Sequence, residues 1–395
     1  MNIAWFANTD FQEGNAASSR IRYLSQGLKQ NGNLINLFIL RPIGFSSTGI
    51  NRKNKGFFNG IYFNYLNGSA TRSHSFFTRS FQYLISLVRS VAVLITHRKR
   101  FDIIFIYQPR FLFFGHLYIL SKILKIPLIL EITELEDSKP THSFWQKIIK
   151  LTDKIDLHLL KHFCFHLVVI SDHLKLHFSS YFPSEKITKI PILIDRNRFS
   201  KPVKRAPSYS IGYLGSFASK DGVTGIILSF KEALKTLPQL KLKLIGYNPY
   251  EKYFSDKIKE NQLEGYVELS GQISYEDVNE WLTSCDLLIL NRTNHPYSHY
   301  GFPTKLGEYL ATGIPTICTR VGDIETYLEH SKHSYLIEPD DTSQLTNAII
   351  TRYQNYEAFN MMGMRGREIA LSKFDYQHYI PVLQKIFESA VHSKK

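Results

Sequence analysis

Cysteine, long apolar runs and several familiar short motifs are scarce or absent in this 395-residue sequence. Its three cysteines, Cys164, Cys285 and Cys318, lie far apart in apolar surroundings, which predicts a reducing compartment and neither a disulfide framework nor a zinc site. No apolar run reaches the ~18 residues that a transmembrane helix needs. Arg89 interrupts the best candidate, residues 83–96, so we expect no transmembrane helix.

The N-terminus, MNIAWFANTD, has neither a basic segment nor a cleavage site, and it predicts a first strand rather than a signal peptide. The loop that follows contains Gly14 and leads into a helix near Arg20. This order opens a nucleotide-type α/β domain, but no G-x-G-x-x-G is present, which excludes a dinucleotide fingerprint.

Negative charge is sparse in the first half of the chain. Residues 1–195 hold 24 Lys and Arg against 12 Asp and Glu, while residues 196–395 hold 24 against 22. A basic half indicates an anionic partner, either a membrane surface or nucleic acid. Aromatic residues accompany the charge at 75–84 and 111–120, which favours a membrane interface over ordinary core packing. No recognised nucleic-acid module is present, so we expect no nucleic-acid partner.

Alternating short strands and helices predict an α/β protein whose parallel sheets are covered on both faces. At 395 residues, we expect two domains. The predicted organisation is an N-terminal domain at 1–195, a hinge linker at 196–208, a second domain at 209–355, and final helices at 356–395 that cross back to the first domain.

One stretch predicts a parallel crossover unit at a ligand site. Leu287–Leu290 is a short apolar strand, 291–303 is a polar loop, and Thr304–Thr312 is a short helix. Gly313 stands where a left-handed helix end favours glycine, and 314–318 is the next strand. In open α/β sheets ligands bind beyond the carboxyl ends of the strands, where this loop and the helix start lie.

The helix start offers unpaired N–H groups and a positive dipole end, which suit a phosphate group. Lys305 adds a cation there, and Glu308, one turn further on the face of Thr304, can accept hydrogen bonds from sugar hydroxyls. The alternative is a surface helix whose Lys305 and Glu308 are merely solvated.

This stretch resembles the donor-site motif of glycosyltransferase family 4, retaining enzymes of the GT-B fold. The matching residues are Pro303, Thr304, Lys305, Glu308, Tyr309, Ala311, Gly313 and Pro315. The resemblance implies two Rossmann-like domains facing across a cleft, and a role for Glu308 in binding the nucleotide ribose. The family's first glutamate should fall at Tyr300, so the residue that usually contacts the transferred sugar is replaced.

A glycine-containing loop after the strand at 209–214 is the second part of the resemblance. Gly215 lets the backbone approach a ligand closely. The family's loop ends in Lys-Gly and binds the diphosphate, which implies that role for Lys220, with Asp221 inserted before the glycine. Arg292 is a candidate second cation, and the alternative for Lys220 is an exposed loop lysine.

In the first domain the resemblance is weaker. It implies that Gly14 and Arg20 lie beside the transferred sugar and the acceptor, although Arg20 could equally be a solvated first-turn residue. Many family members carry, where this chain has Thr133, a histidine that contacts the donor sugar. Thr133 is a catalytic-site candidate that can hydrogen-bond a hydroxyl or phosphate but cannot act as an acid or base. The neighbouring Glu134 is a candidate to stabilise positive charge on the sugar or to bind an acceptor hydroxyl. The alternative is a solvated loop before a helix at 143–162.

The implied reaction is transfer of a sugar from a nucleotide-diphosphate donor to a hydroxyl, with retention. No D-x-D occurs in the chain, so we expect cations and amides to replace a metal, and no cofactor. The expected partners are a nucleotide sugar, a lipid-linked bacterial polysaccharide acceptor, and the cytoplasmic face of the membrane, reached through the basic N-terminal half. A nucleotide-sugar epimerase of the same fold and a non-catalytic scaffold subunit are alternatives; Tyr300 and Thr133 favour the scaffold.

Overall fold

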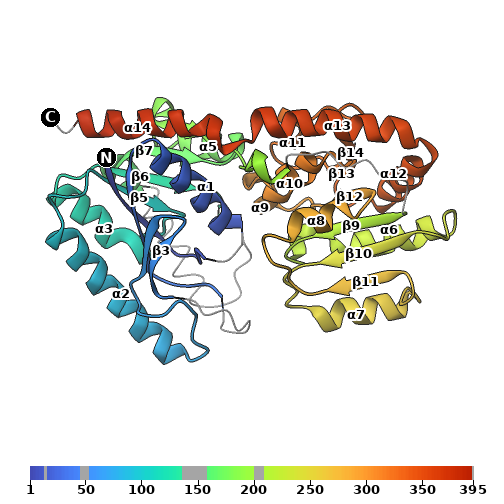
Figure 1. Ribbon diagram of the computed structural model, residues 1–395, viewed down its shortest axis with the longest axis horizontal. Coiled ribbons are helices and arrows are strands. Elements are labelled where there is room, and N and C mark those ends of the chain that lie inside the picture. Colours follow the sequence, from blue (N-terminus) through green and yellow to red (C-terminus); the bar gives the residue numbers. More distant parts are fainter. Residues whose placement is uncertain (13–15, 45–52, 136–157, 200–208, 394–395) are drawn as a thin grey trace. The chain divides into compact units, whose positions relative to one another are not determined.

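The structure is a computed structural model, and it describes residues 1–12, 16–44, 53–135, 158–199 and 209–393. The chain divides into two compact units (Figure 1). The first unit is Met1–Pro191 together with Tyr376–Lys395, and the second is Ile192–Asp375. Among the described helices, none combines the length and apolar character that crossing a membrane requires.

The first unit is built on a sheet whose strand order is β3-β4-β2-β1-β5-β6-β7-β8. All adjacent pairs are parallel except β3–β4. The strands are β1 Asn2–Ala7, β2 Leu34–Ile39, β3 Lys55–Phe58, β4 Ile61–Tyr65, β5 Ile103–Tyr107, β6 Leu128–Ile132, β7 Cys164–Val169 and β8 Ile187–Lys189.

The polar, glycine-rich composition of residues 41–60 predicts a loop, and this prediction was wrong where the antiparallel strand β3 lies. Phe58 pairs with Ile61, and the two intervening residues, Asn59 and Gly60, have φ values of 49° and 73°. Positive φ at both central residues, in an Asn-Gly pair, is typical of a two-residue hairpin turn. The hairpin signal was therefore present in the sequence.

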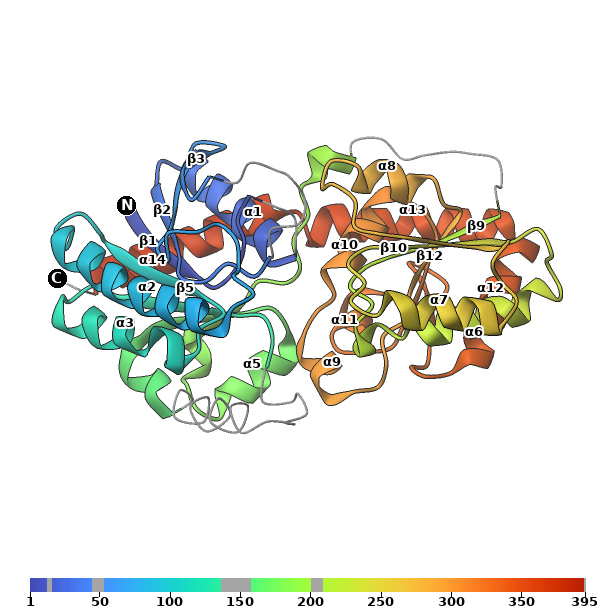
Figure 2. The same cartoon turned by 90° about the horizontal axis from the view of Figure 1, so that it is seen from below.

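Strand β1 is central, and its register with β2 runs from Asn2↔Leu34 to Ala7↔Ile39. Its last five residues are buried, as expected for a parallel strand covered on both faces. In the figures, α1 (Ala16–Gln30) and α14 (Ile380–His392) lie on one side of the sheet. Helices α2 (Phe76–Thr96) and α3 (Phe111–Ile123) lie side by side on the other (Figures 1 and 2).

The second unit is built on a parallel sheet with the order β11-β10-β9-β12-β13-β14. Its strands are β9 Ser210–Leu214, β10 Lys241–Ile245, β11 Val267–Ser270, β12 Leu287–Leu290, β13 Thr316–Thr319 and β14 Tyr335–Ile337. Its helices are α6 Val223–Leu234, α7 Glu251–Glu260, α8 Val278–Thr283, α9 Pro296–Tyr300, α10 Thr304–Thr312, α11 Ile324–Tyr327, α12 Thr342–Gln354 and α13 Tyr356–Lys373. Helix α9 falls within the predicted loop, whereas α10 has the predicted bounds and Gly313 follows it at φ 79°.

Each sheet contains a point where the chain reverses the direction in which it adds strands. In the second unit the chain runs outward from β9 through β10 and β11, and then returns to build β12, β13 and β14 on the other side of β9. In the first unit the corresponding neighbours are β1 and β5. The loops that leave the carboxyl ends of such neighbours diverge, which makes this the usual ligand position in open α/β sheets.

Candidate functional site

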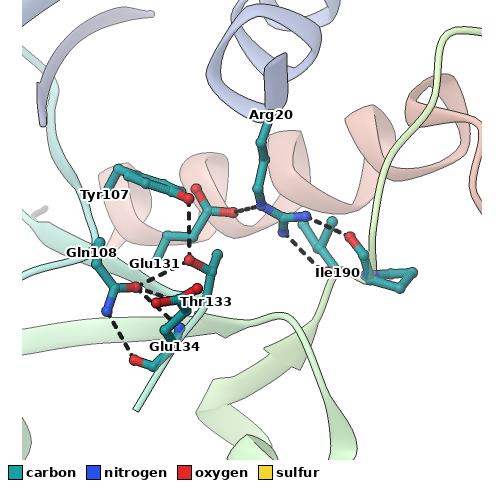
Figure 3. A network of polar contacts seen from close by, with 8 residues as sticks. Arg20, Tyr107, Gln108, Glu131, Thr133, Glu134 and Ile190 are labelled. Carbon is teal, nitrogen blue, oxygen red and sulfur yellow. Dashed lines mark hydrogen bonds and ion pairs between the residues drawn. The ribbon is translucent and has the colours of Figure 1, made fainter. Parts of the chain in front are cut away.

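In the first unit, Arg20 and Glu131 form a buried ion pair at the carboxyl end of β6 (Figure 3). Arg20 Nε lies 2.7 Å from Glu131 Oε1, and Arg20 also donates to the carbonyl oxygens of Ile190, at 2.7 Å, and Pro191. The alternative that Arg20 is a solvated first-turn residue is therefore wrong. Burial raises the pKa of Glu131, and Arg20 opposes that rise. The pair fixes the last two residues of the first unit before the chain enters the second, and the acceptor role of Arg20 stays a prediction.

Gln108 holds the loop that contains Thr133 and Glu134 (Figure 3). Its Oε1 accepts from Thr133 N at 2.8 Å and from Glu134 N at 3.2 Å, and its Nε2 donates to Glu134 O at 2.8 Å. Gln108 itself has φ 50°, an uncommon backbone for a side-chain-bearing residue and one that clusters at functional sites. The hydroxyls of Thr133 and Tyr107 are 3.1 Å apart. The two predicted catalytic residues therefore stand on a braced loop, while Gly14 lies outside the described residues.

Three arginines from separate parts of the first unit line one pocket, a feature that the sequence analysis missed. Arg41, Arg72 and Arg79 line it together with Tyr83. Arg41 also stacks 4.7 Å from the ring centre of Phe113. Burial lowers the pKa of Arg41, and the neighbouring guanidinium groups, Arg72 first, lower it further. Positive charge is thus concentrated beyond the carboxyl end of β2, by residues too widely spaced to form a sequence motif.

In the second unit, Lys305 reaches from the first turn of α10 to the loop after β9. Its Nζ lies 3.5 Å from Asp221 Oδ2 and donates to Tyr213 Oη at 3.2 Å. Gly215 makes room for it, because a Cβ there would overlap both the ammonium group and the Tyr213 hydroxyl. Ser216 Oγ donates to the same Asp221 oxygen at 2.8 Å.

Arg292 and Lys220 complete a group of cations around Asp221, which is itself buried. Burial alone raises the pKa of Asp221, but Lys305, Arg292 and the Ser216 hydroxyl outweigh it, so its pKa lies below the usual value. Burial lowers the pKa of Lys305, and Arg292 and Lys220 lower it further against the attraction of Asp221. Within this group, three cations surround one carboxylate, so an added anion would be attracted.

Backbone contacts fix where Lys220 and Arg292 stand. Arg292 N donates to Thr319 Oγ1 at 2.9 Å, which ties the end of β12 to the end of β13. Thr293 N donates to Lys220 O at 3.1 Å, which ties the loop after β12 to the loop after β9. The Lys220 ammonium lies 5.7 Å from the ring centre of Tyr297. The cations are thus supplied by two loops that meet at the point where the sheet reverses.

Tyr309 anchors α10 to the same place. Its hydroxyl accepts from Leu214 N at 2.7 Å and donates to Leu214 O at 3.0 Å. The ladder between β9 and β12 contains only Ile211↔Leu287 and Gly212↔Leu288. Beyond it the strands separate, and a tyrosine hydroxyl takes the place of the missing strand partner. This contact orients the face of α10 that carries Thr304, Lys305 and Glu308.

Glu308 is held by Arg198, a residue that the sequence analysis did not single out. Arg198 Nη1 lies 3.5 Å from Glu308 Oε1. The other end of the guanidinium donates to Tyr275 O at 2.6 Å, and its carbon lies 3.6 Å from the Tyr275 ring centre. Arg198 belongs to the 3₁₀ turn η3, Arg196–Phe199. The Glu308 carboxylate is therefore partly exposed and oriented by Arg198.

Residues 195–369 match the family described as Glycosyl transferases group 1. The second unit therefore carries a glycosyl transferases group 1 domain. The matched range contains all six predicted donor-site residues, and a group 1 domain is consistent with the family predicted from the motif around Glu308.

The chain is similar in sequence to a curated glycosyltransferase and in fold to two solved structures. The putative colanic acid biosynthesis glycosyltransferase WcaL of Escherichia coli K12 is 25% identical over 213 residues, or 53% of this chain and 48% of that protein. The chain thus spans about half the length of this curated relative. Sucrose-phosphate synthase from Thermosynechococcus elongatus superposes with a TM-score of 0.77 at 17% identity, covering 99% of both chains. Anabaena HepE, solved with UDP-glucose, gives 0.73 at 17% identity, covering 98% and 99%.

These structural likenesses confirm the predicted fold class, an α/β protein with Rossmann-like domains of the GT-B type. The group 1 domain contains three cations close to Asp221: Lys220, Arg292 and Lys305. Gly215 leaves the space that the Lys305 ammonium occupies. The predicted residues Thr304 and Glu308 follow on α10. Sequence reasoning named Asp221 only as an insertion, because an isolated aspartate gives no sign that it is buried among cations. Within the described residues, no group of three or more His, Cys, Asp or Glu side chains is placed to hold a metal ion.

Proposed function

We propose that this protein is a retaining glycosyltransferase that moves a sugar from a nucleoside-diphosphate donor to a hydroxyl group. The observation that carries the proposal is the set of three cations, Lys220, Arg292 and Lys305, around the single carboxylate of Asp221. It stands beside the start of α10, at the reversal point of a parallel sheet. A diphosphate leaving group develops negative charge as the sugar departs, and fixed cations with helix amides stabilise that charge.

The donor would lie along α10. Its diphosphate would take the place near Lys305 and the first-turn N–H groups, with the Thr304 hydroxyl alongside. One turn further, Glu308 would accept hydrogen bonds from the ribose hydroxyls, and Arg198 would hold its carboxylate in place. Because Anabaena HepE was solved with UDP-glucose, we favour a uridine diphosphate sugar as the donor.

The first unit would supply the acceptor-side groups. Glu134 is our candidate to stabilise positive charge on the sugar or to bind the acceptor hydroxyl, from a loop that Gln108 braces. Thr133 can donate a hydrogen bond, but its hydroxyl is no acid or base near neutral pH. The leaving phosphate would therefore take the acceptor proton on the same face of the sugar, without a metal. Gly14 and Arg20 stay acceptor-side predictions.

We further propose that the acceptor is a lipid-linked saccharide of a bacterial surface polysaccharide, the class of product named for WcaL. The positive charge of Arg41, Arg72 and Arg79 would attract a phosphate group on such an acceptor, since a guanidinium group can donate two hydrogen bonds to phosphate oxygens. The protein would then act at the cytoplasmic face of the membrane, as a peripheral protein.

The first test is thermal unfolding of the purified protein with UDP, GDP, ADP or CMP. A ligand present at about 100 times its dissociation constant stabilises the native state by about 2.7 kcal/mol. We expect one nucleoside diphosphate, UDP, to raise the melting temperature. The rise should fall by roughly half or more in Lys305→Ala and Glu308→Ala. It should persist in Lys231→Ala, a control on α6. If no nucleotide at millimolar concentration shifts the transition, the donor site is refuted and the scaffold alternative is favoured.

The second test follows the anomeric carbon. With an α-linked donor and a lipid-linked acceptor fraction, we expect an α-linked product. In the NMR spectrum of the product, the one-bond carbon–proton coupling at the anomeric carbon and the coupling between H1 and H2 distinguish an α from a β linkage. A β-linked product would refute retention while leaving glycosyl transfer intact.

A further inference from the structure

Helix α2 presents its large apolar side chains to the outside. Phe77 is 84% exposed, and the next members of the stripe are all more than half exposed: Phe81, Leu84, Val88 and Ile95. Steps of four, three, four and seven residues place these side chains on one face of the helix. An exposed apolar stripe of this length marks an interaction surface.

Two of the three buried residues of α2 are serines. Ser86 Oγ donates to Leu40 O at 2.7 Å, and Ser90 Oγ lies 2.7 Å from His116 Nε2. Ser86 and Ser90 are both buried, together with Leu94. A helix that faced water would show the opposite arrangement, with its apolar stripe on the core. The sequence of α2 therefore suits an apolar neighbour outside the unit.

Helix α3 extends this surface. It lies beside α2 (Figures 1 and 2), and Leu112, Ile119 and Ile123 are each more than two-fifths exposed. Steps of seven and four residues again place them on one helical face. We call these eight residues of the two helices the α2–α3 face.

Exposed cations stand at the ends of α2 and α3. Residues 14–130 contain 16 Lys and Arg and a single carboxylate, Asp102. The residues just beyond α2 include Arg98, Lys99 and Arg100, all exposed, and α3 ends beside the exposed Lys122. An apolar face rimmed by cations complements a surface that is apolar inside and anionic outside. An anionic lipid bilayer has that character, whereas a second copy of this face would bring like charges together.

We propose that the α2–α3 face docks in the plane of an anionic lipid bilayer. Phe77, Phe81 and their neighbours in the stripe enter the boundary between head groups and acyl chains, and the basic rim contacts the lipid phosphates. Docking on a bilayer rests on the proposed function, because a lipid-linked acceptor would be held in the same bilayer.

The test is co-sedimentation with lipid vesicles, one set of phosphatidylcholine alone and one in which about a third is phosphatidylglycerol. The key variant is Phe77→Ser with Phe81→Ser, because exposed side chains contribute little to the fold. Its control is Leu176→Ser, on helix α5 (Asp172–Ser179) of the same unit, where the leucine is 74% exposed. The wild type and the control should bind the anionic vesicles, and the double variant should bind at least about tenfold more weakly, since burial of one phenylalanine has about that effect.

A charge variant, Arg98→Glu with Arg100→Glu, should weaken binding about fivefold per residue and reduce its sensitivity to salt. Equal binding by the double phenylalanine variant and its control would overturn the proposal, as would equal binding to both vesicle sets. A dimer that the double variant converts to a monomer, without a change in lipid binding, would assign the face to self-association and also overturn it.

The UDP-dependent rise in melting temperature is measured on the same variants. Vesicle binding without any nucleotide response would refute the proposed function and leave this surface assigned. A nucleotide response without vesicle binding would overturn the membrane-docking surface and leave the proposed donor site intact.

Discussion

Lys305→Ala should weaken UDP binding while hardly changing the binding of uridine. In the free protein the Lys305 ammonium lies 3.5 Å from Asp221 and donates to Tyr213 at 3.2 Å. After the substitution Asp221 keeps the Ser216 hydrogen bond and the charges of its other cations. We therefore expect the variant to fold and to lose one charged contact to the diphosphate.

The size of the effect follows from that one contact. A hydrogen bond to a charged group contributes about 1.5–3 kcal/mol, and every 1.4 kcal/mol is tenfold in affinity. The UDP dissociation constant should therefore rise by roughly 10- to 100-fold. Uridine has no phosphate, so its dissociation constant should change less than about twofold, within the spread of surface substitutions.

Isothermal titration calorimetry with UDP and uridine measures both constants. Glu308→Gln is the complementary variant: if Glu308 binds ribose, UDP and uridine should weaken equally, by about tenfold. Lys231→Ala, whose ammonium contacts Asn261 at 3.1 Å, is the matched lysine control and should leave both ligands unchanged. Equal losses for UDP and uridine in Lys305→Ala, or UDP binding within twofold of the wild type, would refute the assignment of Lys305 to the diphosphate.

Four further substitutions, of which Gly265→Ala is a control, test the fold. Gly246 has φ 136°, and a Cβ there would overlap the backbone carbonyl of Gly215. Gly246→Ala should therefore lower the free energy of unfolding, measured in urea, by more than about 2 kcal/mol. Gly265→Ala, where a Cβ would meet open space, should lower it by less than about 1 kcal/mol. Tyr309→Phe removes both hydrogen bonds to Leu214 and should cost about 1–3 kcal/mol; an unchanged urea midpoint would contradict the role of this tyrosine. Burial lowers the pKa of His116 to about 4 from 6.5, so its neutral form stabilises the fold above pH 6.5 and this contribution is lost as the pH falls towards 4. Between pH 6.5 and pH 4, the free energy of unfolding should fall less steeply in His116→Asn than in the wild type. Equal slopes for the two proteins would refute this role of His116.

Periodic elements were predictable because their pattern is local. Helix α10 spans Thr304–Thr312, with the predicted bounds. Strand β3 was missed because a polar loop and a hairpin share composition, although Asn59 and Gly60 carried the turn signal. The family was also accessible from sequence, because the donor motif is compressed into one helix and its flanks.

The pairings within the site could not be inferred in this way. Asp221 and Lys305 are 84 residues apart in the chain, and Arg198 and Glu308 are 110 apart. Arg20 was considered as an acceptor-side or solvated residue, yet it pairs with Glu131 in the interior. Each of these ion pairs joins residues from distant segments of the chain. The spacing of residues within one segment cannot predict them.

The amino-acid sequence by itself determined the alternation of strands and helices, the basic character of the first half, and the donor motif on α10, because period, composition and motif are local properties. Only the tertiary structure decided that three cations share Asp221, that Tyr309 replaces a missing strand partner at Leu214, and that α2 turns its apolar stripe outward. Those features depend on how parallel strands separate at a reversal point and on which face of a helix meets the core, and both are set by packing between segments far apart in the chain.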